Sequence, residues 1–214
     1  PTPTVTPRPT PTSRPTPTVS VNFEGTGDTV LGPFQLVEGI AVLIASHQGS
    51  RNFIVQLIGA KGGEDYSINA IGSYTGARAH SIHDSKFGGL PPDQYRLNVT
   101  ADGAWNIRVS QEFPSAGQAP PFQLEGRGDD VIKWLNLENG TFLITTRHAG
   151  VSNFIIALMN ANGSSDTYIV NEIGDYTGEQ LVKVERGRFG LNPSPGIYAI
   201  VVRADGEWTI AVKQ

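Results

Sequence analysis

The sequence predicts an all-β protein made of two tandem antiparallel β-sandwiches, jelly-roll-like in topology, that follow an extended tail rich in proline and threonine. Composition is the first reason, because 25 Gly and 15 Pro in 214 residues suit short strands joined by many turns. The second is that no stretch shows the helical apolar period of about 3.6 residues. The third is that the second half of the chain repeats the first, which marks tandem structural units.

The repeat sets the domain boundaries. The segment from Ile44 to Leu57 returns as Thr145 to Leu158, with a histidine, a glycine and an Asn-Phe pair at matching places. Differences in length between the copies fall in turns, where insertions are best tolerated. We therefore expect a tail over residues 1–20, a first sandwich over 21–111, a linker over 112–121 and a second sandwich over 122–214.

The tail is low-complexity sequence. Within residues 1–18 proline and threonine dominate, and Arg8 and Arg14 are the only charged residues. Proline fixes φ and lacks an amide donor, so the segment favours a stiff polyproline II conformation. The same composition is typical of O-glycosylated stalks on exported proteins, with an unmodified linker as the alternative. The candidate O-glycosylation sites are Thr2, Thr4, Thr6, Thr10, Thr12, Thr16 and Thr18.

Each sandwich is expected to begin at a Gly-x-Gly-Asp turn, followed by a strand whose nearly alternating apolar residues face a core. The next two strands are rich in Ile, Val and Phe, as the interior of a sandwich requires. An Asp-Gly pair flanked by alternating apolar residues, at Asp102 and again at Asp205, predicts a hairpin near the end of each copy. Together these segments give about seven or eight short strands per copy.

The repeated motifs resemble a known kind of module. They read Gly-x-Gly-Asp, His-x-Gly-x-x-Asn-Phe, Ile-Gly-x-Tyr-Thr-Gly and Ala-Asp-Gly-x-Trp in both copies. This set resembles an uncharacterised β-sandwich repeat of secreted bacterial and archaeal proteins, and it is loosely similar to pre-peptidase C-terminal and carbohydrate-binding modules. The resemblance covers residues 21–214. It implies an accessory extracellular domain and supplies no functional residues to carry over.

Charge and composition argue against several classes of function. The net charge of −4 comes from 16 basic and 20 acidic residues without runs, so we expect neither a nucleic-acid partner nor a polybasic membrane anchor. No apolar run approaches the roughly 20 residues that span a bilayer. The chain has no cysteine, and no Ser-His-acid set, Gly-x-Ser-x-Gly elbow or phosphate loop recurs. We therefore expect no enzyme activity and no cofactor.

Four histidines are the obvious metal candidates. His47 and His148 occupy matching places at a strand end, but no further ligands recur beside them, so a structural role is expected. His80 and His83 are three positions apart, and residues at that spacing on a strand point to opposite faces. The second copy has no histidine there. We expect no metal site.

Three tryptophans are candidates for contact with sugar rings. Trp105 and Trp208 share a strand face with isoleucine and valine, so they are expected in the core. Trp134 faces away from Leu135, and its counterpart in the first copy is Pro33. We therefore expect Trp134 to be exposed, as a sugar-binding or interface residue, with an idle surface tryptophan as the alternative.

The turn residues of the Gly-Asp motif suggest two further roles. Arg127-Gly128-Asp129 spells an adhesion tripeptide, but the Gly-Asp pair recurs for turn geometry and the arginine is expected to be incidental. Asp28, Asp129 and Asp130 could help to hold Ca²⁺, although no closely spaced set of carboxylates supports this.

Asn98, Asn139 and Asn162 begin acceptor tripeptides for N-glycosylation. Such short patterns arise by chance, but together with the threonine-rich tail they favour a glycoprotein of the cell exterior.

Two functions are compatible with these observations. The first is a non-catalytic structural subunit of an extracellular filament or surface assembly, a head-to-tail homo-oligomer in which the stiff tail docks on the neighbouring subunit. The second is an accessory carbohydrate- or surface-binding tandem module of a secreted hydrolase. Both place the protein outside the cell, with glycans as covalent or bound partners.

Overall fold

The fold is all-β, as the sequence predicts. The computed structural model describes residues 19–84, 89–112, 114–163, 166–186 and 192–214. Every regular element in these ranges is a strand, so the described chain contains no helix that could cross a membrane. The candidate O-glycosylation sites from Thr2 to Thr18 lie outside the described residues.

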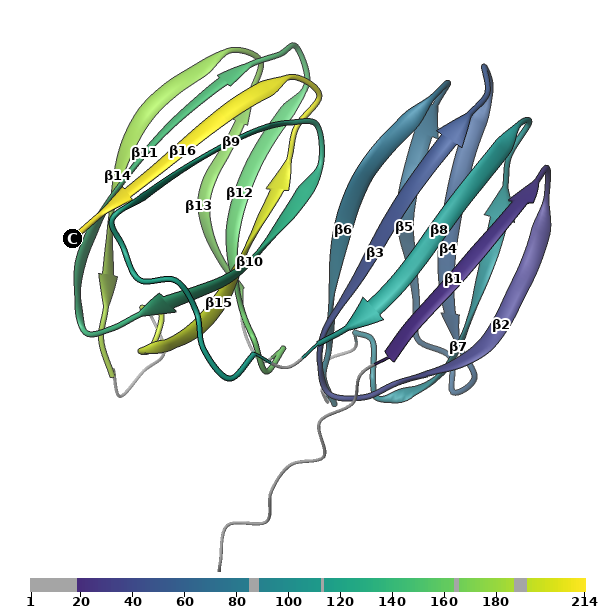
Figure 1. Cartoon of the computed structure of the whole chain (residues 1–214), viewed down its shortest axis with the longest axis horizontal. Coiled ribbons are helices and arrows are strands. Elements are labelled where there is room, and N and C mark those ends of the chain that lie inside the picture. The colour runs from purple at the N-terminus through teal and green to yellow at the C-terminus, as the bar shows by residue number, and fades with distance from the viewer. Residues whose placement is uncertain (1–18, 85–88, 113, 164–165, 187–191) are drawn as a thin grey trace, which may run out of the picture.

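The first eight strands form two four-stranded antiparallel sheets that face each other as a sandwich (Figure 1). Sheet 1A has the order β1-β8-β3-β6, and sheet 1B has the order β2-β7-β4-β5. The chain passes from one sheet to the other at almost every turn, which is the connectivity of a jelly roll. The strands are β1 (Val19–Thr26), β2 (Thr29–Leu36), β3 (Gly39–Gln48), β4 (Asn52–Gly59), β5 (Glu64–Ile71), β6 (Tyr74–Ile82), β7 (Asp93–Thr100) and β8 (Ala104–Gln111).

The second eight strands repeat this arrangement. Sheet 2A has the order β9-β16-β11-β14, and sheet 2B has the order β10-β15-β12-β13. These orders match sheets 1A and 1B strand for strand. The strands are β9 (Phe122–Arg127), β10 (Asp130–Leu137), β11 (Gly140–Ala149), β12 (Asn153–Asn160), β13 (Asp166–Ile173), β14 (Tyr176–Val184), β15 (Gly196–Arg203) and β16 (Glu207–Lys213).

Strand boundaries depart from expectation at one end. The first strand begins at Val19, so Val19 and Ser20, which we assigned to the tail, are paired in sheet 1A with Gln111 and Ser110. Their place opposite the last residues of β8 explains the difference, because ladder pairing extends β1 beyond the point where the composition changes.

Each sandwich has its own apolar core. Phe53 and Tyr95 are fully buried in the first, and Phe154 and Tyr198 are buried in the second. Trp105 is also in the core of its sandwich, and the matching Trp208 is buried in the same way, as expected. Burial of an aromatic or large aliphatic side chain stabilises by about 1.5–3 kcal/mol, so these alternating residues decide the register of every central strand.

A third apolar cluster joins the two sandwiches. It lies between the outer face of sheet 1A and the outer face of sheet 2B, and we call it the seam. Figure 1 shows the sandwiches side by side, with β6 of the first beside the second, and β6 contacts β10. The buried members of the seam are Ile40, Val42, Ala77, Val131, Met159, Ala199 and Val201.

The linker reinforces this arrangement. The Gln118 amide donates to the Trp134 carbonyl at 2.8 Å, and the Asn136 amide donates to the Gln118 carbonyl at 2.9 Å. These bonds add the linker to the free edge of β10, which would otherwise expose unpaired backbone groups.

Candidate functional site

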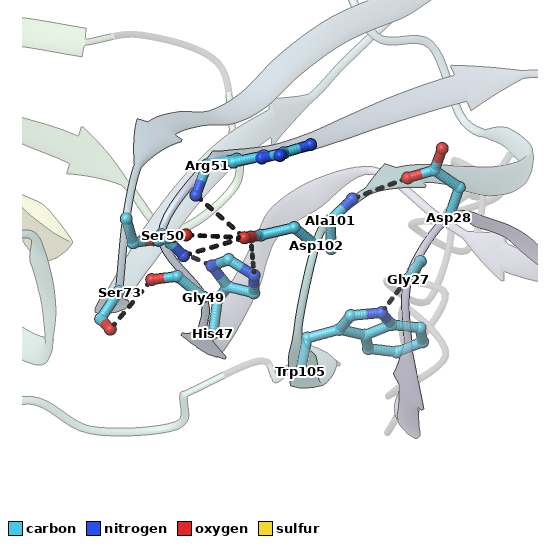
Figure 2. A network of polar contacts seen from close by, with 11 residues as sticks. Gly27, Asp28, His47, Gly49, Ser50, Arg51, Ser73, Ala101, Asp102 and Trp105 are labelled. Carbon is cyan, nitrogen blue, oxygen red and sulfur yellow. Dashed lines mark hydrogen bonds and ion pairs between the residues drawn. The ribbon is translucent and has the colours of Figure 1, made fainter.

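The residues repeated in both copies gather at one end of each sandwich. Figure 2 shows this network in the first sandwich, where the end of β3, the loop after it and the β7–β8 turn meet. The His47 imidazole is buried, stacks on Phe53 with ring centroids 4.6 Å apart, and has Nδ1 2.9 Å from the Gly72 carbonyl oxygen. A carbonyl only accepts, so Nδ1 is the protonated nitrogen.

An aspartate closes the network from the opposite side. Asp102 Oδ2 accepts hydrogen bonds from the backbone amides of Ser50 and Arg51 at 3.0 and 3.1 Å. Its Oδ1 lies 3.4 Å from His47 Nε2, and this nitrogen makes no hydrogen bond with any described residue. The bond from the Ser50 amide is the main reason that the pKa of Asp102 lies below its usual value. Gly49 is required here because a Cβ would collide with both Asp102 and the imidazole.

The second sandwich repeats the main contacts of this network, although Val151 replaces Ser50 and the hydroxyl bond to the aspartate is lost. His148 stacks on Phe154 at 4.5 Å and has Nδ1 2.8 Å from the Gly174 carbonyl oxygen. Asp205 Oδ2 accepts from two backbone amides at 3.0 and 3.1 Å. Burial acts to raise the pKa of Asp205, but these amide bonds outweigh it and the pKa is lowered. Both histidines are therefore structural, as expected: they hold a loop.

The Gly-x-Gly-Asp turn is held in place by a tryptophan that packs against it and bonds to it. Trp105 Nε1 donates to the Gly27 carbonyl at 2.9 Å, and Gly25 lies against the indole ring, where a Cβ would collide. Asp28 Oδ1 then accepts from the Ala101 amide at 2.9 Å (Figure 2). The motif is thus a second loop lock, and Trp208 makes the same bond to Gly128.

Asp129 does more than its copy Asp28. Its Oδ1 accepts from the Ala204 amide at 3.2 Å, as Asp28 does for Ala101. Its Oδ2, however, crosses to the first sandwich, where it accepts from the Tyr74 hydroxyl at 3.1 Å and lies 2.9 Å from Arg78 Nη2. The Tyr74 pKa is raised, first by burial and then by this carboxylate. The second copy of the motif is therefore part of the junction between the sandwiches.

A cleft of about 840 Å³ lies beside this junction, between the two sandwiches. Its walls are mostly polar, with three arginines, two asparagines and several hydroxyl groups. A smaller hollow of about 240 Å³ continues along the seam and shares Ile155 and Arg203 with the cleft. The residues that line the cleft include Asn69, Ser73, Tyr74, Thr75, Arg78, Arg127, Asp129, Asn153, Arg203 and Asp205.

Trp134 is not placed as expected. We predicted an exposed side chain, but Trp134 is half-buried and packs against the apolar cluster of the seam. The reason is that the outer face of β10 is covered by the first sandwich, which the strand pattern alone does not reveal. Trp134 thus lies at an interface, as one of the two expected roles requires, but the interface is the one between the two sandwiches of this chain.

The N-glycosylation candidates lie in different settings. Asn139 is exposed in the turn between β10 and β11. Asn98 is half-exposed in the middle of β7, and Asn162 is exposed in the turn after β12, although Ser164 of its tripeptide is outside the described residues. Only for Asn139 is the whole tripeptide described with its asparagine exposed.

The histidine pair is divided between two partners. His80 is buried with Nδ1 3.5 Å from Asp65, whereas His83 has Nδ1 3.3 Å from Glu38. His80 lowers the pKa of Asp65, and Arg203 adds to the effect from the second sandwich. In the described part of the chain no group of three or more His, Cys, Asp or Glu side chains could hold a metal ion.

The acidic turn residues are likewise engaged. Asp130 Oδ1 accepts from the Val131 amide at 2.7 Å, and Asp28 and Asp129 hold the turns described above. The carboxylate of the Arg127-Gly128-Asp129 tripeptide therefore faces the junction, bonded to Tyr74 and Arg78, instead of standing free at a loop tip.

Comparison with known proteins gives no family. No family model matches the chain, and no curated protein matches it. Among solved structures, the chain is matched to the stem and receptor-binding domain of the spike protein P1 from bacteriophage PM2, with 11% identity over 96% of this chain and 81% of that one. The TM-score is 0.14, so this match supports no inference about fold or function.

Proposed function

We propose that the chain is a non-catalytic structural unit of an extracellular filament or surface assembly, in which the glycosylated Pro/Thr tail docks on the neighbouring subunit. The observation that carries this proposal is the seam. Domains within one chain usually move relative to each other unless their interface is apolar and extensive. Here the apolar cluster, the Asp129 bridge and the linker on the edge of β10 all restrain the same junction. A stiff pair of sandwiches suits a structural element.

The faces that remain free support a role for the tail. A filament could in principle repeat the seam contact from subunit to subunit, because each subunit keeps one free copy of each face. Those copies carry charges: Glu179 replaces Ala77 on sheet 2A, and Arg96 replaces Ala199 on sheet 1B, beside exposed apolar side chains such as Leu181 and Val30. Stacking these faces would remove Glu179 and Arg96 from water, and the attraction between them would have to offset that cost. We therefore assign assembly to a different contact, that of the tail.

The network residues support a non-catalytic role. The buried histidines and the aspartates beside them are the groups most suited to acid–base chemistry in this chain, and each is occupied in holding a loop. Their function in the fold explains why they recur in both copies.

An accessory carbohydrate- or surface-binding module is the second candidate. The observation that favours it is the polar cleft between the sandwiches, since ligand sites occur preferentially at domain junctions.

Electron microscopy of the native protein tests the structural proposal. The full chain is expected to form fibres, and the chain from residue 19 onwards is expected to remain monomeric in sedimentation experiments. Intact mass above that of the polypeptide would establish glycosylation. Fibres from the shortened chain, or a full chain that stays monomeric at every concentration, would contradict the proposal.

A further inference from the structure

The arginines of the cleft are the clearest chemical difference between the two copies. Arg127 and Arg203 of the second copy occupy the places of Thr26 and Thr100 in the first. On the other wall, Arg78 of the first copy occupies the place of Gln180 in the second. At each of these pairs of positions, the copy that faces the cleft has arginine and the copy that does not is uncharged. Because the fold accepts an uncharged residue at these places, folding does not explain the arginines.

Two of the three guanidinium groups remain available. Arg127 is exposed and makes no side-chain hydrogen bond or ion pair with any residue of the described ranges. Arg203 is also exposed, and its interaction with Asp65 is a longer-range attraction without an ion pair. Arg78 is different, because it is paired with Asp129.

The two carboxylates of the cleft form no ion pair with Arg127 or Arg203. Asp129 is bonded to Arg78, Tyr74 and a backbone amide, and Asp205 accepts two backbone amides. Both are therefore satisfied by the protein itself. The lining of the cleft thus contains three arginines and two aspartates in a chain with a net charge of −4, and two of the three guanidinium groups form no ion pair with a described residue.

The rest of the lining consists of groups that bind hydroxyls. The Asn69 and Asn153 amides are exposed on opposite walls, and neither makes a side-chain hydrogen bond to a described residue. Ser73 and Thr75 add hydroxyl groups from the β5–β6 turn and the start of β6. Amides both donate and accept, as does a sugar hydroxyl, whereas a guanidinium binds a carboxylate through two parallel hydrogen bonds.

We propose that the cleft between the sandwiches binds an acidic oligosaccharide, with Arg127 and Arg203 holding its carboxylates and Asn69 and Asn153 its hydroxyls. The volume of about 840 Å³ lies within the range of known small-molecule sites. The tail of a neighbouring molecule does not suit this site, because its only charges are Arg8 and Arg14. The proposal rests on the second candidate function and leaves assembly through the tail untouched.

Calorimetric titration of the full chain tests the site. The probes are acidic oligosaccharides of about four sugars, from galacturonate, alginate and hyaluronate, at low and at moderate salt. At least one is expected to bind, and its affinity should fall about tenfold or more in Arg127→Gln and in Arg203→Gln, since a charge-assisted hydrogen bond is worth roughly 1.5–3 kcal/mol. Arg96→Gln is the matched control, because Arg96 is exposed on β7 in sheet 1B and does not line the cleft, and it should bind as the unaltered chain does.

Neutral and peptide probes distinguish the source of the negative charge. The methyl ester of tetragalacturonate keeps the sugar rings and removes the charge, so it is expected to bind weakly or not at all. An oligoglutamate peptide supplies carboxylates without hydroxyls, and it should bind more weakly than the acidic sugar. The proposal is overturned if none of the acidic sugars binds, if ester and acid bind alike, if the peptide binds as well as the sugar, or if Arg96→Gln has the same effect as the cleft variants. None of these results bears on fibre formation by the tail.

Discussion

The outer faces of the two sandwiches differ far more than their cores. At the seam, Ala77 and Ala199 are buried, and the same two positions in the other copy are occupied by Glu179 and Arg96, which face solvent. The cores, by contrast, are apolar at nearly all matching positions, with Phe53 and its counterpart Phe154 both fully buried, although residue sizes differ at a few places such as Ala41 and Phe142. One jelly roll therefore accepts either an apolar or a charged outer face, and which one it has depends on whether another sheet covers that face.

This difference also shows that the junction has a direction. The outer faces of sheet 1A of the first sandwich and sheet 2B of the second are apolar where they meet. The outer faces of sheets 1B and 2A carry Arg96 and Glu179 at the matching positions, with Val30 and Leu181 exposed on the same faces. A third sandwich that joined through these faces would therefore have to bury two charged side chains.

Exchanging a seam residue for its own copy should have the largest effect. Ala199 in β15 corresponds to Arg96 in β7 of the first copy, so Ala199→Arg gives the second sandwich the residue that the first already has at this position. The sandwich should remain folded, since the first copy tolerates this residue. The seam should open, because an unpaired charge buried there costs about 3 kcal/mol or more. Small-angle X-ray scattering should show a larger radius of gyration, and calorimetry should show two separate unfolding transitions.

Arg96→Ala is the matched control for this exchange. Arg96 is exposed, so its loss should leave the scattering curve and the transition temperature nearly unchanged. If Ala199→Arg leaves the two sandwiches as compact as before, the seam is not the contact that joins them.

The strand pattern predicts the sandwiches but not the surface between them. Alternation places Trp105 and Trp208 in the cores, and the Asp-Gly pairs mark the hairpins, because these signals are local. Trp134 is the informative error. It lies on the outer face of β10, and its burial depends on a sheet that lies far away in the sequence. Only a comparison of the two copies, in which Ala77 corresponds to Glu179, contains a signal for this contact.

The same comparison could have located the cleft. The exchange of Thr26 for Arg127 between otherwise matching turns leads to the prediction that the arginine is incidental; in the proposed binding site, the same exchange distinguishes the copy that faces the cleft. What no sequence pattern could give is that Arg127, Arg203 and Arg78 come together, since they belong to three strands of two sandwiches.

A smaller effect is expected for the polar contacts that Asp129 makes across the junction between the sandwiches. Asp129→Asn keeps an oxygen for the Ala204 amide but leaves the partly buried Arg78 without its counter-charge. Asp28→Asn makes the same change in the first copy, where the carboxylate holds only the Ala101 amide. We expect Asp129→Asn to lower the free energy of unfolding by about 2 kcal/mol, as for other hydrogen bonds to charged groups, and Asp28→Asn by less.

Urea denaturation of the two variants measures this difference. Equal losses would mean that the contact of Asp129 with Tyr74 and Arg78 adds nothing to stability. In that case the apolar cluster of the seam would stabilise the junction without help from these polar contacts.

The smallest expected effect concerns a feature that the two copies share. Asp102 and Asp205 both have lowered pKa values in the folded chain, the first mainly because of the Ser50 amide and the second because its amide bonds outweigh the effect of burial. In the unfolded chain an aspartate has a pKa of about 3.9. Each carboxylate therefore stabilises the fold fully above about pH 4, and its contribution is lost as the pH falls through the folded-state pKa.

Stability measured by urea denaturation should thus decline below about pH 4, and Asp102→Asn and Asp205→Asn should each make that decline shallower to a similar extent. Similar slopes are expected because each aspartate accepts two backbone amides, at 3.0 and 3.1 Å in both copies. Clearly unequal slopes would show that the bonds found in one copy alone, such as that from the Ser50 hydroxyl to Asp102, change how strongly the aspartate holds its loop.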